Sequence, residues 1–175
     1  MSENTIEQDI TNDDGQAKFS LSKIYVKDAS FEAPNTPEIF TATSPNVNLE
    51  LNTSNRHVKD DGYEVVINVT VTAKQDDQVV FIAEVKQAGL FLIRNMEDAA
   101  QRHTLGSFCP TILFPYARQE ISALIGAGGF PQLLLAHINF EQLFQAQEQR
   151  RQQEAQGGQE AAAPTGAAPT DNATF

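Results

Sequence analysis

An alternation of apolar and polar side chains from residue 63 to residue 73 restricts the fold of this 175-residue chain more than any other feature. Every second residue in it is apolar, and most positions between are polar. A period of two is typical of a β-strand with one buried and one solvated face. The apolar parity holds Tyr63, Val65, Ile67, Val69, Val71 and Ala73, and the polar parity holds Glu64, Asn68, Thr70 and Thr72.

Three further runs predict strands that complete a sheet with this one. Residues 79–91 follow a short polar connection, residues 74–78, which suits an antiparallel hairpin. Residues 19–31 and 47–51 come earlier, and the stretch between them holds three prolines, which exclude a continuous central strand there. We therefore expect a four-stranded antiparallel sheet with a long crossover loop.

Two helices are predicted in the C-terminal half. Pro110 and Pro115 are tolerated only near a helix start, so the first helix is expected to begin around them and to run to Ile125. The glycines at positions 126, 128 and 129 supply its stop. The second helix is expected to start at Asn139, with Gln142 at the spacing of a capping box. A sheet packed with two C-terminal helices makes the predicted fold class α+β.

The first predicted helix carries more apolar surface than one sheet face can cover. Its apolar residues form one stripe, and three more lie off that stripe. Burying a large apolar side chain contributes roughly 1.5–3 kcal/mol, so self-association is the simplest way to avoid leaving several exposed. The stripe holds Phe114, Ala117, Ile121, Leu124 and Ile125, and the residues off it are Ile112, Tyr116 and Ala123.

One domain, residues 19–151, is expected between two polar ends. Residues 1–18 are acidic and unpatterned, and residues 152–175 are rich in Ala, Gly and Pro. Neither end can bury enough apolar surface to offset the entropy lost on ordering, so both are predicted to be disordered tails. The domain between them is long enough to bury a sizeable core without metal or disulfide staples.

Charge and cysteine content narrow the classes of partner and compartment. The formal net charge of -11 favours basic partners over nucleic acid or an anionic membrane, although acidity that only aids solubility explains it equally well. The only cysteine, Cys109, cannot form an internal disulfide. No apolar run approaches the roughly 18 residues needed to span a bilayer. These points predict a cytoplasmic protein.

Candidate catalytic and metal-binding residues are few and scattered. The three histidines, His57, His103 and His137, lie far apart in sequence, so a zinc site is not expected. The glycines near position 128 follow a helix and lack the Lys-Ser/Thr ending of a phosphate-binding loop. Ser107 and Cys109 have no sequence setting that marks a nucleophile, and Cys109 is expected to pack in the core. We predict no enzyme, no cofactor and no metal.

Strand parity predicts what each face of the sheet presents. Phe81 and Val85 share one parity and are expected to face the helices, whereas Ile82 and Glu84 share the other and should face outward. In the first strand, Asp28 and Glu32 also share a side. An acidic outward face would result if the two strands belong to one sheet. An ordinary solvated sheet face accounts for the same pattern.

Several segments of the chain resemble a known family. They are KIYVKDASFEAPNTPEIF, YEVVINVTVTAK, FIAEVKQAGLF and CPTILFPYARQEISALIGAGGFPQLLLAHINF. The match covers about residues 23–145, in order and with compatible spacing, and the family is that of the SecB protein-export chaperones of bacteria. The resemblance implies a holdase that binds unfolded precursor proteins without ATP, keeps them translocation-competent and delivers them to the export ATPase SecA. It also implies a homotetramer built as a dimer of dimers.

The resemblance also implies roles for particular residues. A groove for the unfolded chain, or client, would draw on Phe81, Val85 and Tyr116, with Val47 and Phe144. The SecA-contacting face would hold Asp28, Glu32, Ile82 and Glu84. The assembly-forming helix would use Phe114, Ala117, Ile121 and Leu124.

Two other readings remain. One is an adaptor, or a specialised SecB-like chaperone that serves a dedicated partner such as a toxin–antitoxin system. The other, an enzyme with a pocket between sheet and helices, lacks any cluster of acid, base and nucleophile in the sequence and is the least favoured.

Overall fold

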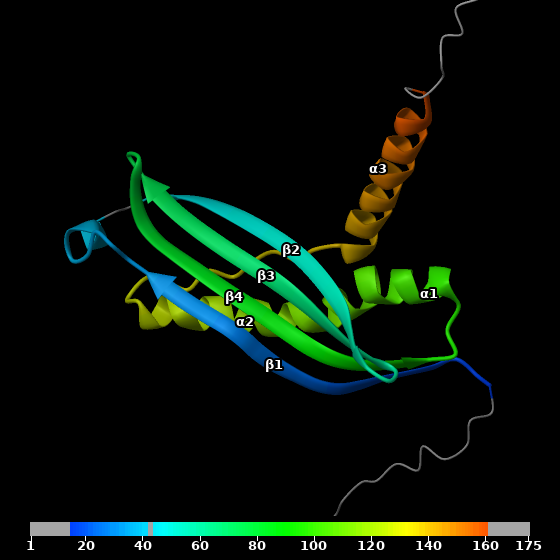
Figure 1. Cartoon of the computed structure of the whole chain (residues 1–175). Coiled ribbons are helices and arrows are strands. Elements are labelled where there is room, and N and C mark those ends of the chain that lie inside the picture. The colour runs from blue at the N-terminus through cyan, green and yellow to red at the C-terminus, as the bar shows by residue number, and fades with distance from the viewer. Residues whose placement is uncertain (1–14, 42–43, 161–175) are drawn as a thin grey trace, which may run out of the picture.

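The computed structural model describes residues 15–41 and 44–160. A single antiparallel sheet forms the frame of the protein (Figure 1). Its strands are β1 (Lys18–Glu32), β2 (Asn46–Lys59), β3 (Gly62–Gln75) and β4 (Gln78–Arg94). Their order is β1-β4-β3-β2, so the chain crosses from one sheet edge to the other between β1 and β2. The predicted four-stranded antiparallel sheet with a crossover is confirmed.

The crossover and the two hairpins show why the strands end where they do. A short 3-10 helix, η1 (Glu38–Thr41), lies within the crossover. Asp76 and Asp77, between β3 and β4, both have positive φ, at 50° and 63°. This conformation suits a tight turn that follows the twist of the strands, and aspartate tolerates it better than most residues do. Asp60, with a φ of 51°, has the same role between β2 and β3.

Strand β2 is much longer than the sequence pattern predicted. The expected strand covered residues 47–51, yet pairing with β3 continues to Lys59. Residues 52–59 are nearly all polar, because β2 is an edge strand that lies beyond much of the helical cover and is exposed along most of its length. A strand with solvent on both faces carries no apolar alternation by which to recognise it.

The helical half begins earlier than predicted. Helix α1 (Asp98–His103) runs through a π-helical turn, η2 (Thr104–Phe108), into α2 (Cys109–Ala127). The expected start around Pro110 is therefore wrong for the helical segment, although it is right for α2, where Pro110 stands in the first turn. Because the π turn has already changed the hydrogen-bond register, a missing amide is least costly there. Pro115 was also expected near the start, but it lies inside α2.

The predicted helix ends are confirmed at two points. At the end of α2, Gly128 donates its backbone N–H to Leu124 at 2.9 Å, and Gly129 has a φ of 86°. At the start of α3 (Phe140–Glu160), the side chain of Asn139 accepts a hydrogen bond from the backbone of Gln142 at 3.1 Å. These are the expected glycine stop and Asn cap.

The two predicted tails overlap ordered elements. Helix α3 continues to Glu160, so the stretch from residue 152 begins inside a helix and not in a tail. At the other end β1 already starts at Lys18. Residues 1–14 and 161–175 lie outside the described residues. Among the described helices, none combines the length and hydropathy needed to cross a membrane.

Helix α2 covers one face of the sheet, which we call the inner face; the opposite one is the outer face (Figure 1). The core lies between α2 and strands β3 and β4. Its fully buried side chains include Ile67, Phe91, Leu113, Ile121 and Ile125. The alternation that opened the sequence therefore divides β3 into a buried row and a polar row, as predicted.

The apolar stripe of α2 packs against its own sheet and not, as expected, against a sister subunit. Phe114, Ala117 and Ile121 are 3%, 0% and 0% exposed, and Leu124 is partly buried against the same core. The sheet buries this stripe because α2 packs directly on the buried apolar residues of β3 and β4. What the helical segment leaves exposed is its other flank, where Phe108 and Tyr116 are 50% and 48% accessible.

Candidate functional site

The outer face carries the acidic residues that the sequence predicted, side by side. Glu32 pairs with Ile82 across β1 and β4, and Glu84 and Asp28 lie in the next rows. We call Asp28, Glu32, Ile82 and Glu84 the acidic patch. One cation lies beside the patch: Lys86, opposite Asp28 in the sheet. Its ammonium group is 2.9 Å from the carboxylate of Asp28 and 3.5 Å from that of Glu84. The register thus brings all four predicted residues together, with part of their charge neutralised.

A second charged group on the outer face was missed by sequence reasoning. Glu64 of β3 accepts hydrogen bonds from Arg56 at 2.6 Å, from Lys27 at 2.9 Å and from the hydroxyl of Tyr25. Its side chain is only 5% exposed, although it faces away from the core. The three donors hold the pKa of Glu64 down to about 2, while burial and the bond to Glu64 raise the pKa of Tyr25 to about 12.

This Glu64 network ties together three strands of the sheet. Arg56 lies directly opposite Glu64 on β2, whereas Tyr25 and Lys27 reach it from β1, across β4. A register shift between Val26 and Asp28 leaves Lys27 as an extra residue in β1. No local signal in the sequence marks the network, because its members lie up to 39 residues apart and meet only in the folded sheet.

At one end of the inner face an aromatic cluster surrounds Phe81. Its ring lies 5.9 Å from that of Phe31 and 5.1 Å from that of Phe130, and Phe130 lies 5.2 Å from Phe40. These rings come from β4, β1, the segment after α2 and the crossover. A side chain at Gly128 would collide with Phe31 at 2.2 Å, so glycine permits the close approach. Of these residues only Phe81 was predicted.

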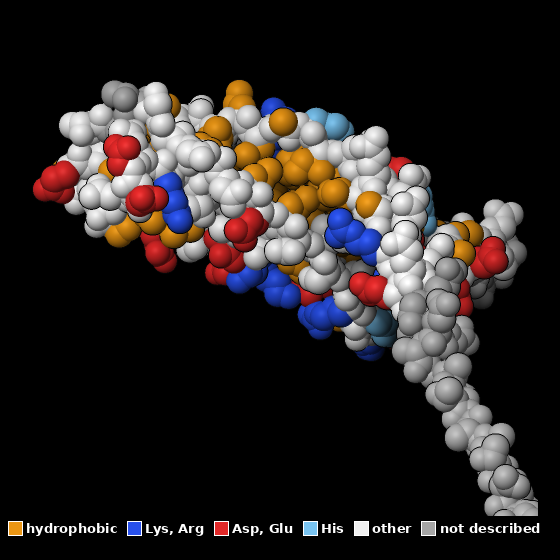
Figure 2. Space-filling model, turned by 90° about the horizontal axis from the view of Figure 1, so that it is seen from above, with side chains coloured by type: hydrophobic (Ala, Val, Ile, Leu, Met, Phe, Trp, Pro, Cys, Tyr) orange, Lys and Arg blue, Asp and Glu red, His pale blue; other side chains and the backbone are white. Residues whose placement is uncertain are grey.

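The apolar residues of β2 form an open row on the inner face. Val47 and Leu49 are 40% and 38% exposed, and Leu51 follows on the same side, partly buried. Their partners on β3 are all buried, so the row continues the core outward. Figure 2 shows hydrophobic side chains gathered in the middle of the molecule when it is viewed from above. We call Val47, Leu49 and Leu51 the β2 row.

Phe144 lies at the far end of the β2 row. It is half-buried, and a side chain at Gly106 would meet its ring at 2.5 Å. Phe144 and Leu51 line a small cavity of about 130 Å³, together with Asn52, Thr53, Gly106, Phe140, Leu143 and Gln147. Leu51 therefore lies between two predicted groove residues: it shares the β2 row with Val47 and the cavity with Phe144.

Polar contacts fasten α3 beside this cavity. Glu141 accepts a hydrogen bond from the hydroxyl of Ser107 at 2.8 Å and pairs with His103 at 2.6 Å. The bonds from Ser107 and His103 lower the pKa of Glu141. The ring of Phe144 meets that of His103 edge-on, at 5.3 Å. The position of α3 therefore depends on a few contacts near its first turns.

The five predicted groove residues do not converge on one pocket. Val85 is 0% exposed and Phe81 5%, so both belong to the core of the closed subunit. Tyr116 lies on the exposed flank of α2 and outside the core cluster. A wider groove of about 540 Å³ runs between α2 and the segment before α3, with Leu134 in its wall at 71% exposure. This groove was not predicted, because the segment that forms it has no regular period.

The described residues hold no group of three or more His, Cys, Asp or Glu side chains that could bind a metal ion. Cys109 is fully buried, and burial raises the pKa of its thiol to about 12. A thiol in that state is protonated and a poor nucleophile. The prediction that Cys109 packs in the core is confirmed.

Comparison with known proteins identifies the family. The family model of the preprotein translocase subunit SecB matches residues 12–151. The protein-export protein SecB of Stutzerimonas stutzeri is 54% identical over 140 residues, which cover 79% of this chain and 85% of that protein. The protein of the same description from Pseudomonas syringae pv. syringae is 51% identical over 147 residues, covering 83% and 90%.

A solved structure shares the fold. It is that of a SecB-like chaperone of Mycobacterium tuberculosis, in complex with a ChAD peptide from an antitoxin. The two chains are 18% identical and superpose with a TM-score of 0.58, over 69% of this chain and 90% of the other. The family model covers most of the sequence, and the identities above exceed half over about four fifths of the chain. This chain belongs to the SecB family.

Proposed function

We propose that this SecB-family chain is an ATP-independent holdase, which binds unfolded precursor proteins, keeps them translocation-competent and delivers them to the export ATPase SecA in the cytoplasm. The β2 row is the observation that carries the proposal. Val47 and Leu49 remain more than one third exposed beside a core that is otherwise closed. An exposed apolar surface of this kind is typical of a site that binds another chain.

An unfolded client can cover the β2 row without a fixed sequence. In the sheet order β2 has a strand neighbour on one side only, so its other edge is available to an extended chain. Main-chain hydrogen bonds with such an edge are independent of sequence, and alternate side chains would point to the inner face, over Val47, Leu49 and the cavity at Phe144. Recognition then rests on apolar burial every second residue.

The aromatic cluster and the groove along α2 extend this surface. Phe40, at 51% exposure, and Leu134, at 71%, offer apolar contacts on either side of the closed core. Phe81 and Val85 remain part of the proposed client site. Phe81, whose ring packs against that of Phe130, becomes accessible when the segment after α2 moves. Several weak contacts along one client raise the effective concentration at each further contact, so binding is tight while each contact still exchanges.

Delivery to SecA uses the acidic patch in this proposal. Asp28, Glu32 and Glu84 lie on the outer face, away from the client surface, so the protein could hold a client and the ATPase at once. Ile82 adds an apolar contact within the same patch. A basic segment of the partner fits this combination of charge and shape.

A homotetramer, arranged as a dimer of dimers, completes the proposal. Phe108 and Tyr116 lie on the exposed flank, and Phe108 packs edge-on against Phe19 of β1 with ring centroids 5.3 Å apart. Both the flank and the free edge of β1 would be covered by self-association. Four copies also multiply the client surface along one unfolded chain.

Native mass measurement tests assembly and client binding together. We expect a tetramer that gains mass when an unfolded precursor is added, and that delays refolding of the precursor without nucleotide. A stable monomer that leaves the refolding rate unchanged would rule the proposal out. The variant Leu49→Asn, in the exposed β2 row, should keep the tetramer and shorten the delay.

An adaptor or a chaperone for a dedicated partner is the second candidate, favoured only by the complex in which the M. tuberculosis fold relative was solved. Charge reversal in the acidic patch separates the two roles. Glu84→Lys with Glu32→Lys should abolish SecA binding and leave the refolding delay intact. If both were lost together, one surface would serve both partners, and the separation of client and SecA sites would be wrong.

A further inference from the structure

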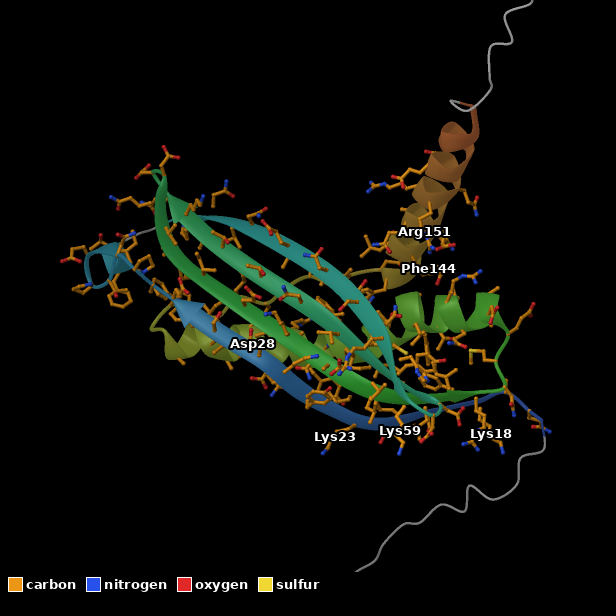
Figure 3. The ribbon with its side chains drawn as sticks, viewed as in Figure 1. Lys18, Lys23, Asp28, Lys59, Phe144 and Arg151 are labelled. Carbon is orange, nitrogen blue, oxygen red and sulfur yellow. The ribbon has the colours of Figure 1, made fainter. Side chains whose placement is uncertain are left out.

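One end of the outer face is basic, in a protein whose formal net charge is -11. The sheet register places cations from all of the strands but β3 around the β2–β3 hairpin, and three carboxylates stand beside them, for a net charge of +3. Figure 3 shows three of the lysines at this end of the sheet, well away from Asp28. We call this group the basic end; its cations are Lys18, Lys23, Lys27, Arg56, Lys59 and Arg94, and its carboxylates are Asp60, Asp61 and Glu64.

Internal ion pairs account for part of this charge. Lys27 and Arg56 share Glu64, and Arg94 contacts Asp61 at 2.6 Å. Lys23 and Lys59 are exposed and have no ion-pair partner among the described residues. Lys23 lies opposite Leu90 in the same row as Glu64, and Lys59 lies opposite Gly62 in the next row. The two ammonium groups therefore flank the Glu64 network and contribute part of the excess positive charge of the basic end.

The N-terminal segment of the same chain has the opposite charge. Residues 1–14 contain five acids, namely Glu3, Glu7, Asp9, Asp13 and Asp14, and neither lysine nor arginine. The described chain begins at Gly15, and the backbone oxygen of Gln16 accepts a hydrogen bond from Asn95 at 3.4 Å, just beyond the end of β4. The acidic segment is thus joined to the protein at the basic end itself.

We propose that residues 1–14 dock on the basic end of the outer face, with their carboxylates near Lys23 and Lys59. The tether is short enough to keep the acids close and long enough to reach both lysines. Fourteen extended residues span up to about 46 Å, whereas Lys18 and Lys23 are separated by roughly 17 Å of strand. A tether of this kind sets a local concentration of the order of millimolar.

Docking would change what the outer face offers to other molecules. The basic end would be shielded, and the acidic patch would remain as the exposed charge of that face. Acidic polymers that the free lysines would attract would then be repelled, while basic partners would not. This consequence rests on the proposed role of the acidic patch in SecA binding, but the docking itself does not.

Carbodiimide cross-linking of the full-length protein tests the docking, because it joins only carboxylates and amines in direct contact. We expect links from Asp9, Asp13 or Asp14 to Lys23 and Lys59 at low salt, and their loss at about 0.5 M salt, where the Debye length is only a few ångströms. The matched control is Lys74, an exposed lysine at the other end of β3. Links to Lys74 as frequent as those to Lys23 would overturn the proposal.

Isotope mixing shows which copy the segment occupies. Assemblies prepared from labelled and unlabelled protein should yield links within one copy. Links only between labelled and unlabelled chains would place the segment on a sister copy and refute docking on its own chain.

A fluorescent label at position 2 gives a readout that does not depend on the linked lysines. Cys109, the only cysteine in the sequence, is buried, so Ser2→Cys adds an accessible thiol that can be labelled selectively. At low salt the double variant Lys23→Gln, Lys59→Gln should lower the anisotropy of the label to its high-salt value, whereas Lys74→Gln should leave it unchanged. Equal anisotropy in both variants would refute the proposal. Neither experiment uses a client or SecA, so failure here is distinct from failure of the chaperone proposal.

Discussion

The two faces of the sheet arise from one alternation of residues, yet they differ in what covers them. The inner face is closed by α2 over β3 and β4 and left open along the β2 row. No helix among the described residues packs on the outer face, where ion pairs join Glu64 to Lys27 and Arg56, and Asp28 to Lys86. Stability should therefore depend on the closed part of the inner face, and binding on the open part and on the charges. Substitutions can test each half of this contrast.

The largest effect is expected at the closed part of the inner face. Ile67 is fully buried, and Ile67→Ala should lower the free energy of unfolding by about 2–5 kcal/mol, because it leaves a cavity between β3 and α2. The matched change in the open row, Leu49→Ala, should cost less than about 1 kcal/mol, since Leu49 is already 38% exposed. Urea denaturation of both variants checks the difference. Equal losses would mean that the β2 row is as well covered as the core.

On the outer face the largest loss is expected at Glu64. Glu64→Gln keeps the shape of the side chain but removes the charge that Arg56 and Lys27 share, and should cost about 1–3 kcal/mol. Denaturation of Glu64→Gln beside Glu84→Gln, which is more exposed and pairs only at 3.5 Å, measures the contrast. A loss at Glu84 as large as that at Glu64 would contradict it.

The same carboxylate predicts a pH dependence. Its folded pKa, about 2, lies below its ordinary value of 4.5, so its contribution to stability is complete above about pH 4.5 and is lost as the pH falls towards 2. The free energy of unfolding, measured by urea denaturation across this range, should fall more steeply in the wild type than in Glu64→Gln. Parallel curves for the two proteins would show that Glu64 is not held in its charged form.

A smaller effect is expected where α3 meets the helical segment. Gly106→Ala places a methyl group against the ring of Phe144, which must move aside, at a cost of about 1 kcal/mol. Faster hydrogen exchange confined to α3 would report the displacement. Gly126→Ala is the control, since a side chain there meets only Gln132, at 3.5 Å. If Gly106→Ala left exchange in α3 unchanged, Phe144 would not be what holds that helix.

The smallest effect on stability is expected in the acidic patch. Glu84→Lys removes one exposed ion pair and should change the free energy of unfolding by less than about 0.5 kcal/mol. Its binding to SecA should nevertheless weaken, most clearly at low salt. Calorimetric titration with SecA, with Glu50→Lys on β2 as the control, measures this. Unchanged affinity would remove Glu84 from the proposed partner surface.

Much of the fold could be read from the chain, and the misses have a common cause. The alternation in β3 and the polar hairpin before β4 predicted the centre of the sheet correctly, since a half-buried strand records its two environments residue by residue. Most of β2 was missed because an edge strand has no such contrast. The early start of the helical segment was missed because α1 is polar and has no buried residue.

The site was predicted in part for the same reason. The acidic patch follows from parity within β1 and β4, together with their pairing, so four residues could be placed on one face. The Glu64 network could not be, because Tyr25, Arg56 and Glu64 lie on three strands and show no common pattern. The groove residues assigned through family resemblance lie in four places: the core, the β2 row, the exposed flank of α2 and, for Phe144, the cavity beside α3.

The sequence by itself determined which residues of a strand share a face of the sheet. It also determined where two of the helix ends are capped. These depend on local geometry, the period of two in a strand and the hydrogen bonds of a helix terminus. Only the tertiary structure decided which apolar surface stays uncovered. The α2 stripe, expected to meet a sister subunit, is buried on its own sheet, and the β2 row is left open instead. Coverage depends on how far one helix can reach across four strands, and no single segment contains that information.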